Sequence, residues 1–222
     1  MKTVQEIYTQ YRLPAGLHLH QLRVASVAKL LCGSFPAVLA VDDVLKACLF
    51  HDMGNIIKFD TDTPGYGPLW GSEPMEYWKK VKQEYIDMYG PSEHKATVEI
   101  VKELGLSESV SHYIESIGFQ NLESTRDSDS YELKICEYAD LRVGPFGVLS
   151  LRDRIEDMRM RYQGRHHADM PEDAQKFEEL TQAAFAVEKQ IFDKTSLKPS
   201  DINDASVALI MEALRGMEIG LA

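Results

Sequence analysis

The segment LFHDMGNIIKF, residues 49–59, places two metal-binding residue types side by side. His51 and Asp52 follow an apolar run with helical spacing and precede Gly54, so they lie where a buried helix is expected to end. A desolvated carboxylate without a partner costs several kcal/mol. The pair therefore indicates a bound metal ion, and the question is whether the rest of the chain supplies further ligands.

Two more residues of the same chemistry lie in apolar helical segments. His20, in LHLHQLRVASVAKLL, faces the apolar stripe of its helix, and Asp140 follows a buried run in CEYADLRVG. Each has a structural alternative: His20 could be a hydrogen-bonded core histidine, and Asp140 could pair with Arg142 or cap the following turn. One divalent ion would satisfy both residues together with His51 and Asp52, whereas separate explanations require three coincidences.

Two imidazoles and two carboxylates without a thiolate form a donor set for Mn, Fe, Co, Ni, Zn or, less well, Mg. A structural zinc site is more usually closed by four Cys or His ligands, whereas this set leaves room for water or substrate. Such an ion lowers the pKa of a bound water from ~16 toward ~7 and polarises a phosphoryl oxygen. The chemistry predicted is hydrolysis of a phosphomonoester or phosphodiester, with Asp52 or another carboxylate orienting the water.

Composition limits the function classes. The 222 residues can bury one sizeable core, and the 44% hydrophobic and 27% charged fractions are those of an ordinary soluble globular protein. The formal net charge is −11, from 24 basic and 35 acidic residues, without a groove-sized basic cluster. This field repels a nucleic-acid backbone, so we expect no polymeric nucleic-acid partner, while a small phosphorylated ligand held by a metal is compatible.

Cysteine usage and the apolar runs indicate the compartment. Cys32, Cys48 and Cys136 are odd in number and lie in apolar segments, so we expect reduced, buried thiols. The N-terminal MKTVQEIYTQYRL lacks the apolar core of a signal peptide, and no run approaches the ~18 apolar residues that span a bilayer. A cytoplasmic location without a membrane partner is expected.

Nearly every periodic segment has helical spacing, which predicts an all-α fold. We interpret the chain as a single domain, 1–222, with a core of about 15–145 and a helical extension of about 146–222. Residues 121–130 are expected to be a polar connector. The predicted helices are 3–12, 16–32, one from the N-cap Asp42 to the His-Asp pair, 73–90, one from the cap Ser92 to Leu104, one from the cap Ser107 to about Ile117, 131–145, 150–165, 171–194 and 200–215.

The segment 60–72, DTDTPGYGPLWGS, is rich in Gly, Pro and Asp and is predicted to be a long irregular loop. It is either functional or a surface crossover held by one tryptophan. We expect residues 60–78 and the C-terminal helices to form the pocket walls. The aromatic residues that could stack on a base, with core packing the favoured role for most of them, are Tyr66, Trp70, Tyr77 and Trp78.

The order HQLRVASVAKLL, KACLFHDMGN and CEYADLRVG resembles the HD-domain metal-dependent phosphohydrolase superfamily, whose motif is a helical His, a His-Asp doublet and a distant Asp. The resemblance covers about residues 15–145. It implies a five-helix core, an HD-domain-like helical bundle to which the C-terminal helices are added. It also implies that the metal ligands are His20, His51, Asp52 and Asp140.

Two departures from the family pattern concern the second metal and the phosphate. Two-metal relatives carry further histidines; His94 lies where the first would fall, but the next region reads YIESIGF, and His112 comes about a turn early, as an ordinary surface histidine would. We therefore expect one metal, with His94 near the substrate phosphate or supporting a weak second ion. Asn55 stands where many relatives have Lys, a loss that Lys58 or Arg23 could compensate.

Arg23 lies three residues after His20, on roughly the same side of the helix, so it could contact phosphate or hold a ligand carboxylate. An ion pair at the edge of the core is an equal alternative. The residues predicted to act in catalysis are Asp52, His94 and Arg23.

The sequence therefore predicts a divalent-metal-dependent phosphohydrolase acting on a small phosphorylated metabolite such as a nucleotide. One alternative is a non-catalytic HD-like binding or regulatory module, although such a module would be expected to lose ligands. A di-iron oxygenase is a further alternative, but it needs a six-ligand site and a second histidine. The C-terminal helices could supply a homodimer interface.

Overall fold

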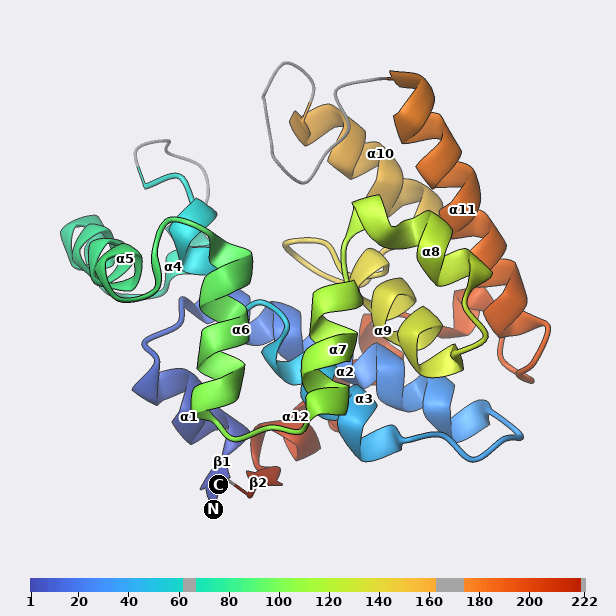
Figure 1. Cartoon of the computed structure of the whole chain (residues 1–222), viewed down its shortest axis with the longest axis horizontal. Coiled ribbons are helices and arrows are strands. Elements are labelled where there is room, and N and C mark those ends of the chain that lie inside the picture. Colours follow the sequence, from blue (N-terminus) through green and yellow to red (C-terminus); the bar gives the residue numbers. More distant parts are fainter. Residues whose placement is uncertain (62–66, 163–173, 221–222) are drawn as a thin grey trace.

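The computed structural model describes residues 1–61, 67–162 and 174–220. Within these residues the chain is helical apart from one short ribbon, which confirms the predicted all-α class (Figure 1). The helices are α1 (Val4–Gln10), α2 (Ala15–Ser34), α3 (Val41–Phe50), α4 (Gly67–Trp70), α5 (Met75–Tyr89), α6 (Glu93–Glu103), α7 (Glu108–Ser116), α8 (Leu122–Asp127), α9 (Tyr131–Leu141), α10 (Leu151–Tyr162), α11 (Ala174–Phe192) and α12 (Asp204–Arg215). Short 3₁₀ helices are η1 (Asn55–Lys58), η2 (Phe119–Asn121) and η3 (Pro199–Asp201).

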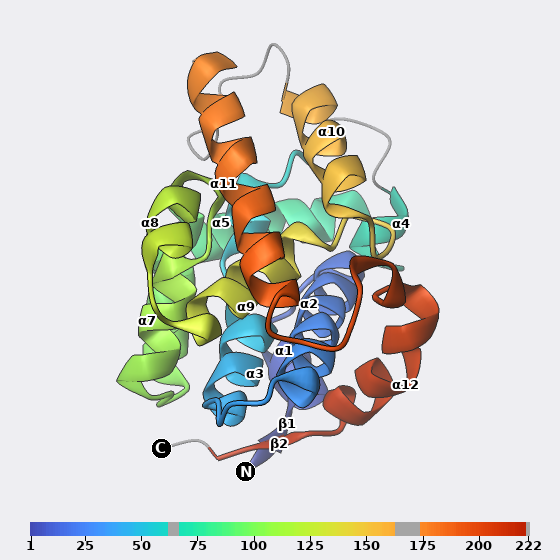
Figure 2. The same ribbon diagram turned by 90° about the vertical axis from the view of Figure 1, so that its right-hand side faces the viewer.

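Helix α2 lies at the centre of the core. Its apolar residues are buried on more than one side, so it packs against α3, α9 and α12 at once (Figures 1 and 2). Pro14 precedes its first turn, where a missing N–H costs nothing, and Pro36 follows its end. This three-way packing brings the middle of α2 next to the end of α3 and the end of α9.

Local capping signals place most helix starts correctly. The Oγ atoms of Ser92 and Ser107 accept from the third residue of α6 and α7, each at 3.3 Å, as predicted. Gly105, beyond the end of α6, has φ of +65°, which favours glycine. The prediction that Asp42 is the N-cap is wrong, because α3 begins at Val41. Asp42 therefore lies in the first turn of the helix, where the helix dipole stabilises its carboxylate.

Two segments predicted to be irregular contain helices. The connector 121–130 contains α8, whose Leu122 and Thr125 are buried where it packs on α9 and α11. The loop 60–72 contains the short helix α4, while residues 62–66, including Tyr66, lie outside the described residues. In both cases tertiary packing stabilises a helix that the polar or Gly/Pro-rich sequence does not indicate.

The C-terminal helices share the core of the rest of the chain. Helix α11 packs on α8 and α9, α12 packs on α2, and the ribbon of β1 (Lys2–Thr3) with β2 (Glu218–Ile219) joins the two ends of the chain (Figure 2). Buried apolar residues form one cluster that extends from Val4 to Ile219. The three cysteines are free and buried, as predicted. Among the described residues, no helix combines the length and apolar character that crossing a bilayer requires.

Candidate metal centre and its cavity

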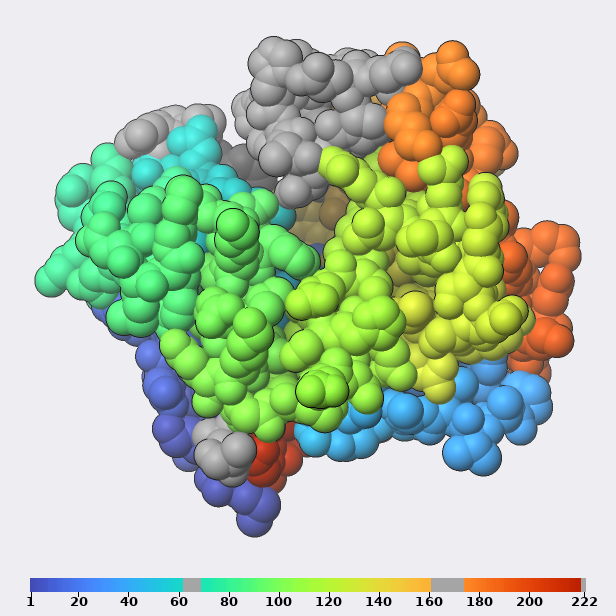
Figure 3. Space-filling model, viewed as in Figure 1, coloured from blue at the N-terminus to red at the C-terminus, as the bar shows by residue number. Residues whose placement is uncertain are grey.

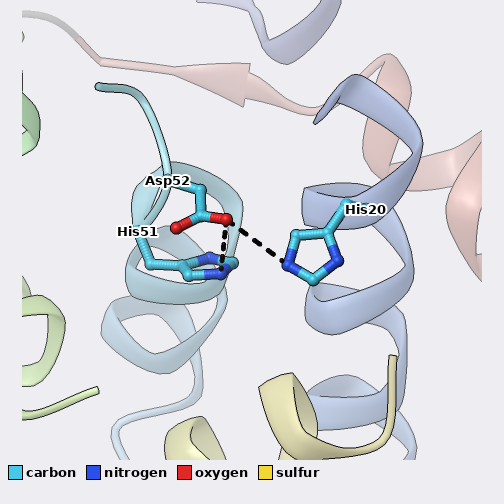
Figure 4. A group of neighbouring side chains, drawn as sticks. All are labelled: His20, His51 and Asp52. Atoms are coloured by element: carbon cyan, nitrogen blue, oxygen red, sulfur yellow. Dashed lines mark ion pairs between the residues drawn. The ribbon is translucent and has the colours of Figure 1, made fainter. Parts of the chain in front are cut away.

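The structure brings the four predicted ligands together from three helices. His20 comes from α2, and His51 and Asp52 follow the end of α3 (Figure 4). Asp140 lies near the end of α9. His20 Nε2 lies 3.0 Å from Asp140 Oδ1 and 3.5 Å from Asp52 Oδ2. His51 Nε2 lies 3.4 Å and 3.6 Å from the same two oxygens. The donor atoms of His20, His51 and Asp52 therefore all lie within 4.8 Å of one another, and Asp140 contacts both imidazoles.

The orientation of His51 fits a metal ligand. Its Nδ1 lies 2.9 Å from the carbonyl oxygen of Cys48, so Nδ1 carries a proton and donates to it, and Nε2 is the ring nitrogen that faces the two carboxylates and could bind an ion. That Nε2 is buried and has no hydrogen-bond partner among the described residues. Two donors that share an ion at ~2.1 Å are separated by roughly 3.0–3.5 Å in tetrahedral or octahedral geometry. The residues present therefore fit a divalent ion.

The carboxylates dominate the electrostatics of the centre without a metal. Burial lowers the pKa of His51, but the charge of Asp52 and the contact with Asp140 outweigh this and raise it to about 10. Burial raises the pKa of Asp140, and the two imidazoles more than reverse this, so that its pKa lies well below the usual range. A divalent ion would supply the positive charge that these two carboxylates need.

The alternative pairing of Asp140 with Arg142 is not what the structure shows. The Arg142 guanidinium is buried and donates to the Tyr138 hydroxyl at 2.7 Å and to the carbonyl of Ile202 at 2.9 Å. The carboxylate of Asp140 instead contacts His20 and His51.

Gln21, which the sequence did not single out, supports the doublet. Its side chain is fully buried, and its Oε1 accepts the backbone N–H of Asp52 at 3.2 Å. This hydrogen bond joins α2 to Asp52, two residues after the end of α3. The only feature of the sequence that could have indicated this role is the position of Gln21 next to His20. A glutamine on a helix does not by itself show whether its side chain faces the core or the solvent.

Gly54 allows α6 to approach the doublet. Its N–H donates to Thr97 Oγ1 at 2.9 Å, and that hydroxyl donates to the Glu93 carbonyl at 3.0 Å. A Cβ on Gly54 would lie only 2.2 Å from the Glu93 carbonyl oxygen. The absence of a side chain at residue 54 thus brings the first turn of α6, which carries His94, to the edge of the metal centre.

A cavity of about 460 Å³ opens on the metal centre. In Figure 3 the surface is hollowed between the green residues of α6 and the yellow-green residues that follow it. The wall has an apolar side, from α7, the segment 117–119 and α10, and a polar side. The polar and charged lining residues are His51, Asp52, Asn55, Lys58, Glu93, His94, Thr97, Glu115, Gln120, Asn121, Asp140 and Arg154.

The other predicted site residues fall in different places. His94 is exposed and lines the cavity. Asn55, which is buried, and Lys58 line the same cavity. Arg23 is not among the lining residues; its Nε lies 3.6 Å from Asp204 Oδ1, so the ion-pair alternative describes its surroundings. His112 is exposed and is also outside the lining.

The predicted cavity walls were partly wrong. Among the described residues of 60–78, none lines the cavity. Trp70 and Trp78 are buried and pack on each other with ring centroids 5.7 Å apart, the core role that the sequence favoured. The C-terminal helices do contribute, through Arg154 and Met158 of α10. The sequence carries no signal for these two residues, since only the packing of α10 brings them to the site.

The described structure is an all-α protein in which His20, His51 and Asp52 form a group that could hold a metal ion, with Asp140 beside it. A family model for the HD domain matches residues 18–141, more than half of the chain, so this chain belongs to the HD domain family. Comparison with curated proteins and with solved structures gave no match. HD domains are typically metal-dependent phosphohydrolases, and His20, His51, Asp52 and Asp140 all lie within the matched segment.

Proposed function

We propose that this protein is a divalent-metal-dependent phosphohydrolase that cleaves a phosphate ester of a small metabolite. The observation that carries the proposal is the buried Nε2 of His51, which has no hydrogen-bond partner among the described residues and lies 3.4–3.6 Å from two carboxylates at the end of a cavity. The family supports the hydrolase class, and the cavity size supports a small substrate.

The residues divide the work by position. A divalent ion held by His20, His51, Asp52 and Asp140 would activate a water and polarise a phosphoryl oxygen. The second carboxylate oxygen of Asp52 is a candidate to accept a proton from the attacking water. His94 lines the same cavity, where its imidazole can donate a hydrogen bond to phosphate or a proton to the leaving oxygen. Water adds to phosphorus, the ester P–O bond breaks, and the alcohol leaves protonated.

The lining also supports a nucleotide as substrate. Apolar side chains of α7 and α10 face part of the cavity, next to the amides of Gln120 and Asn121. An apolar wall with a few amide groups suits the flat, hydrogen-bonding surface of a base. We infer a nucleoside phosphate, with the base away from the metal centre.

The proposal is tested by metal analysis and hydrolysis assays on the purified protein. We expect about one tightly bound metal ion per chain and activity on a panel of nucleoside phosphates. In Asp52→Asn both should fall, activity by more than the about 10- to 100-fold that loss of an outer-shell partner causes. His112→Ala, at an exposed histidine outside the cavity, is the matched control and should retain both.

Asp52→Asn that keeps wild-type metal content and activity would contradict the proposal. A wild-type protein that binds metal but hydrolyses no ester would favour the non-catalytic binding module. Among the described residues, His20, His51 and His94 are the histidines at the metal centre or its cavity, without the second additional histidine that a six-ligand di-iron site needs.

A further inference from the structure

We propose that Asn55 binds the phosphoryl group of the substrate, through hydrogen bonds that its side-chain amide donates to phosphoryl oxygens. The inference rests on the proposed phosphohydrolase function and assigns a further substrate-binding residue to that same site. Asn55 follows Asp52 by three residues and lines the cavity that opens on the metal centre.

The side chain of Asn55 is a buried amide without a partner in the protein. Among the described residues, none forms a hydrogen bond with this amide. The residue is only 6% exposed, and because it belongs to the lining, its amide meets the cavity rather than the outer surface. A buried amide needs a hydrogen-bond partner. For Asn55 this partner has to come from the cavity, either as water or as a ligand.

The other asparagines of the chain show what a structural role looks like. The sequence contains three asparagines. Asn121, which also lines the cavity, donates from Nδ2 to the carbonyl of Ser116 at 3.2 Å. Asn203 is the N-cap of α12 and accepts two backbone N–H groups of its first turn, each at 3.1 Å. Asn55 has no such contact among the described residues, so its amide can serve a ligand.

The backbone holds Asn55 close to the metal centre. The N–H of Asn55 donates to the carbonyl of Asp52 at 3.0 Å, which closes a turn between the two residues. Such a turn keeps its first and last Cα atoms within about 7 Å of each other. Both residues line the same cavity. A phosphoryl group in contact with an ion held by Asp52 therefore lies within reach of the amide.

The chain is fixed on both sides of Asn55. Before it, the N–H of Gly54 donates to Thr97 Oγ1 at 2.9 Å. After it, the side chains of Ile56 and Ile57 are 0% and 6% exposed, and η1 packs on α5 and α6. A donor that is already held in place loses little conformational freedom when a ligand binds, which favours affinity.

The charges beside Asn55 favour a role as a donor to an anion. The nearest carboxylate along the chain is that of Asp52, whose Oδ2 faces His20 Nε2 at 3.5 Å and His51 Nε2 at 3.6 Å. An amide has two N–H donors and carries no charge, so it does not form an ion pair with the carboxylates of the centre. Phosphoryl oxygens accept such donors, and a hydrogen bond to a charged acceptor is stronger than one between neutral groups.

The test separates a ligand-binding asparagine from a structural one. Asn55→Ala removes the amide, and Asn55→Asp keeps its shape without the N–H donors. The matched control is Asn203→Ala, which removes an amide that caps a helix and lies outside the lining. Calorimetry measures binding of inorganic phosphate to the full-length protein loaded with Mn²⁺, after metal analysis of each variant. Thermal unfolding measures stability, and hydrolysis of p-nitrophenyl phosphate measures activity.

The two positions should give opposite results. We expect Asn55→Ala to unfold within about 2 °C of the wild type, because its amide has no protein partner to lose. It should bind phosphate about 10- to 100-fold more weakly, with a similar fall in kcat/KM. Asn55→Asp should bind phosphate more weakly still, because its carboxylate repels the anion, and it carries the test if Asn55→Ala does not fold. Asn203→Ala should unfold at a lower temperature and bind phosphate as the wild type does.

Equal phosphate binding by Asn55→Ala and Asn203→Ala would overturn the inference, and it would leave the hydrolase function intact if the wild type is active. The absence of phosphate binding by the Mn²⁺-loaded wild type would overturn it as well. If the wild type hydrolyses no ester while Asn55→Ala still loses phosphate binding, Asn55 is an anion-binding residue and the proposed hydrolase function fails.

Discussion

At the scale of single residues, buried polar groups around the centre each have a particular partner. Gln21 holds the backbone of Asp52, and Cys48 fixes the tautomer of His51 through its carbonyl oxygen. Glu137, one turn before Asp140 on α9, accepts the N–H of Gly118 at 2.7 Å while its Oε1 is buried without a hydrogen-bond partner. These groups set the positions of the ligands and of the cavity wall, and Glu137 does so at a cost that depends on pH.

Glu137 should make the free energy of unfolding depend on pH. Burial, opposed by the Gly118 hydrogen bond, raises its pKa from 4.5 to about 8. Between these values the unfolded chain releases a proton that the folded chain keeps, so stability falls as pH rises from about 4.5 to about 8 and then levels off. Glu137→Gln keeps an acceptor for Gly118 but cannot ionise. Relative to wild type, it should gain up to a few kcal/mol between about pH 5 and pH 8.5.

Urea unfolding at the two pH values measures this difference. Glu137→Ala is the control, because it removes the acceptor as well as the charge and should be destabilised at both. A wild-type-minus-Gln difference that stays constant across the pH range would show that Glu137 is not held protonated by burial.

At the scale of elements, the junction between the end of α3 and the start of α6 depends on close backbone contact. Gly54, Thr97 and the Glu93 carbonyl form a chain of hydrogen bonds across this junction. The same contact holds His94 beside the metal centre. Stability and the geometry of the site are therefore linked at residue 54.

Gly54→Ala should lower the stability of the protein and disturb the geometry of the site. The added Cβ would meet the Glu93 carbonyl oxygen at 2.2 Å and the Ala96 Cβ at 2.7 Å, so α6 must move. We expect a loss of about 1–3 kcal/mol in the free energy of unfolding and reduced hydrolysis at saturating metal. Gly33→Ala in α2 is the matched control, since nothing lies within 4 Å of its new Cβ and helix propensity favours alanine. Equal stability of the two variants would show that α6 adapts without cost.

Elements defined by local signals could be predicted from the sequence, and others could not. Ser92 and Ser107 predict the starts of α6 and α7 because the hydroxyl of an N-cap residue accepts a hydrogen bond from the first turn of its own helix. Helix α8 was not predicted because NLESTRDSDS shows no apolar stripe. Its buried residues pack on α11, which lies about 50 residues further along the chain. Prediction failed where the stabilising partner is distant in sequence.

At the scale of the whole molecule, the same distinction separates the ligands from the rest of the site. That His20, His51, Asp52 and Asp140 lie together could be inferred because an uncompensated His or Asp in an apolar helix is costly wherever it lies. Arg23 and Arg154 could not be placed, since the first lies beside Asp204 of α12 and the second reaches the cavity only through the packing of α10. Asp204 and Arg154 both belong to the C-terminal extension, so this extension is part of the structure that surrounds the metal centre.

Arg142 ties this extension to the helix that carries Asp140. Its guanidinium donates to the Tyr138 hydroxyl of α9 and to the carbonyls of Leu149, Pro199 and Ile202, and it is only 2% exposed. The end of α9 with the turn after it and the distant segment 199–202 thus share one buried cation. The hydroxyl of Tyr138 in turn donates to a carboxylate oxygen of α11 at 2.6 Å, which extends the network to a third segment.

Arg142→Met should therefore destabilise the whole chain rather than one end of it. Methionine fills part of the volume but removes the donor from the buried carbonyl of Ile202 and from the part-buried carbonyls of Leu149 and Pro199, and we expect a loss of about 3 kcal/mol or more. Arg126→Met, which removes a surface ion pair with Asp127, is the control and should change stability by no more than about 0.5 kcal/mol. Hydrogen exchange should show faster exchange in α9, α11 and α12 together; faster exchange confined to α12 would mean that the extension is stabilised independently of the metal-binding core.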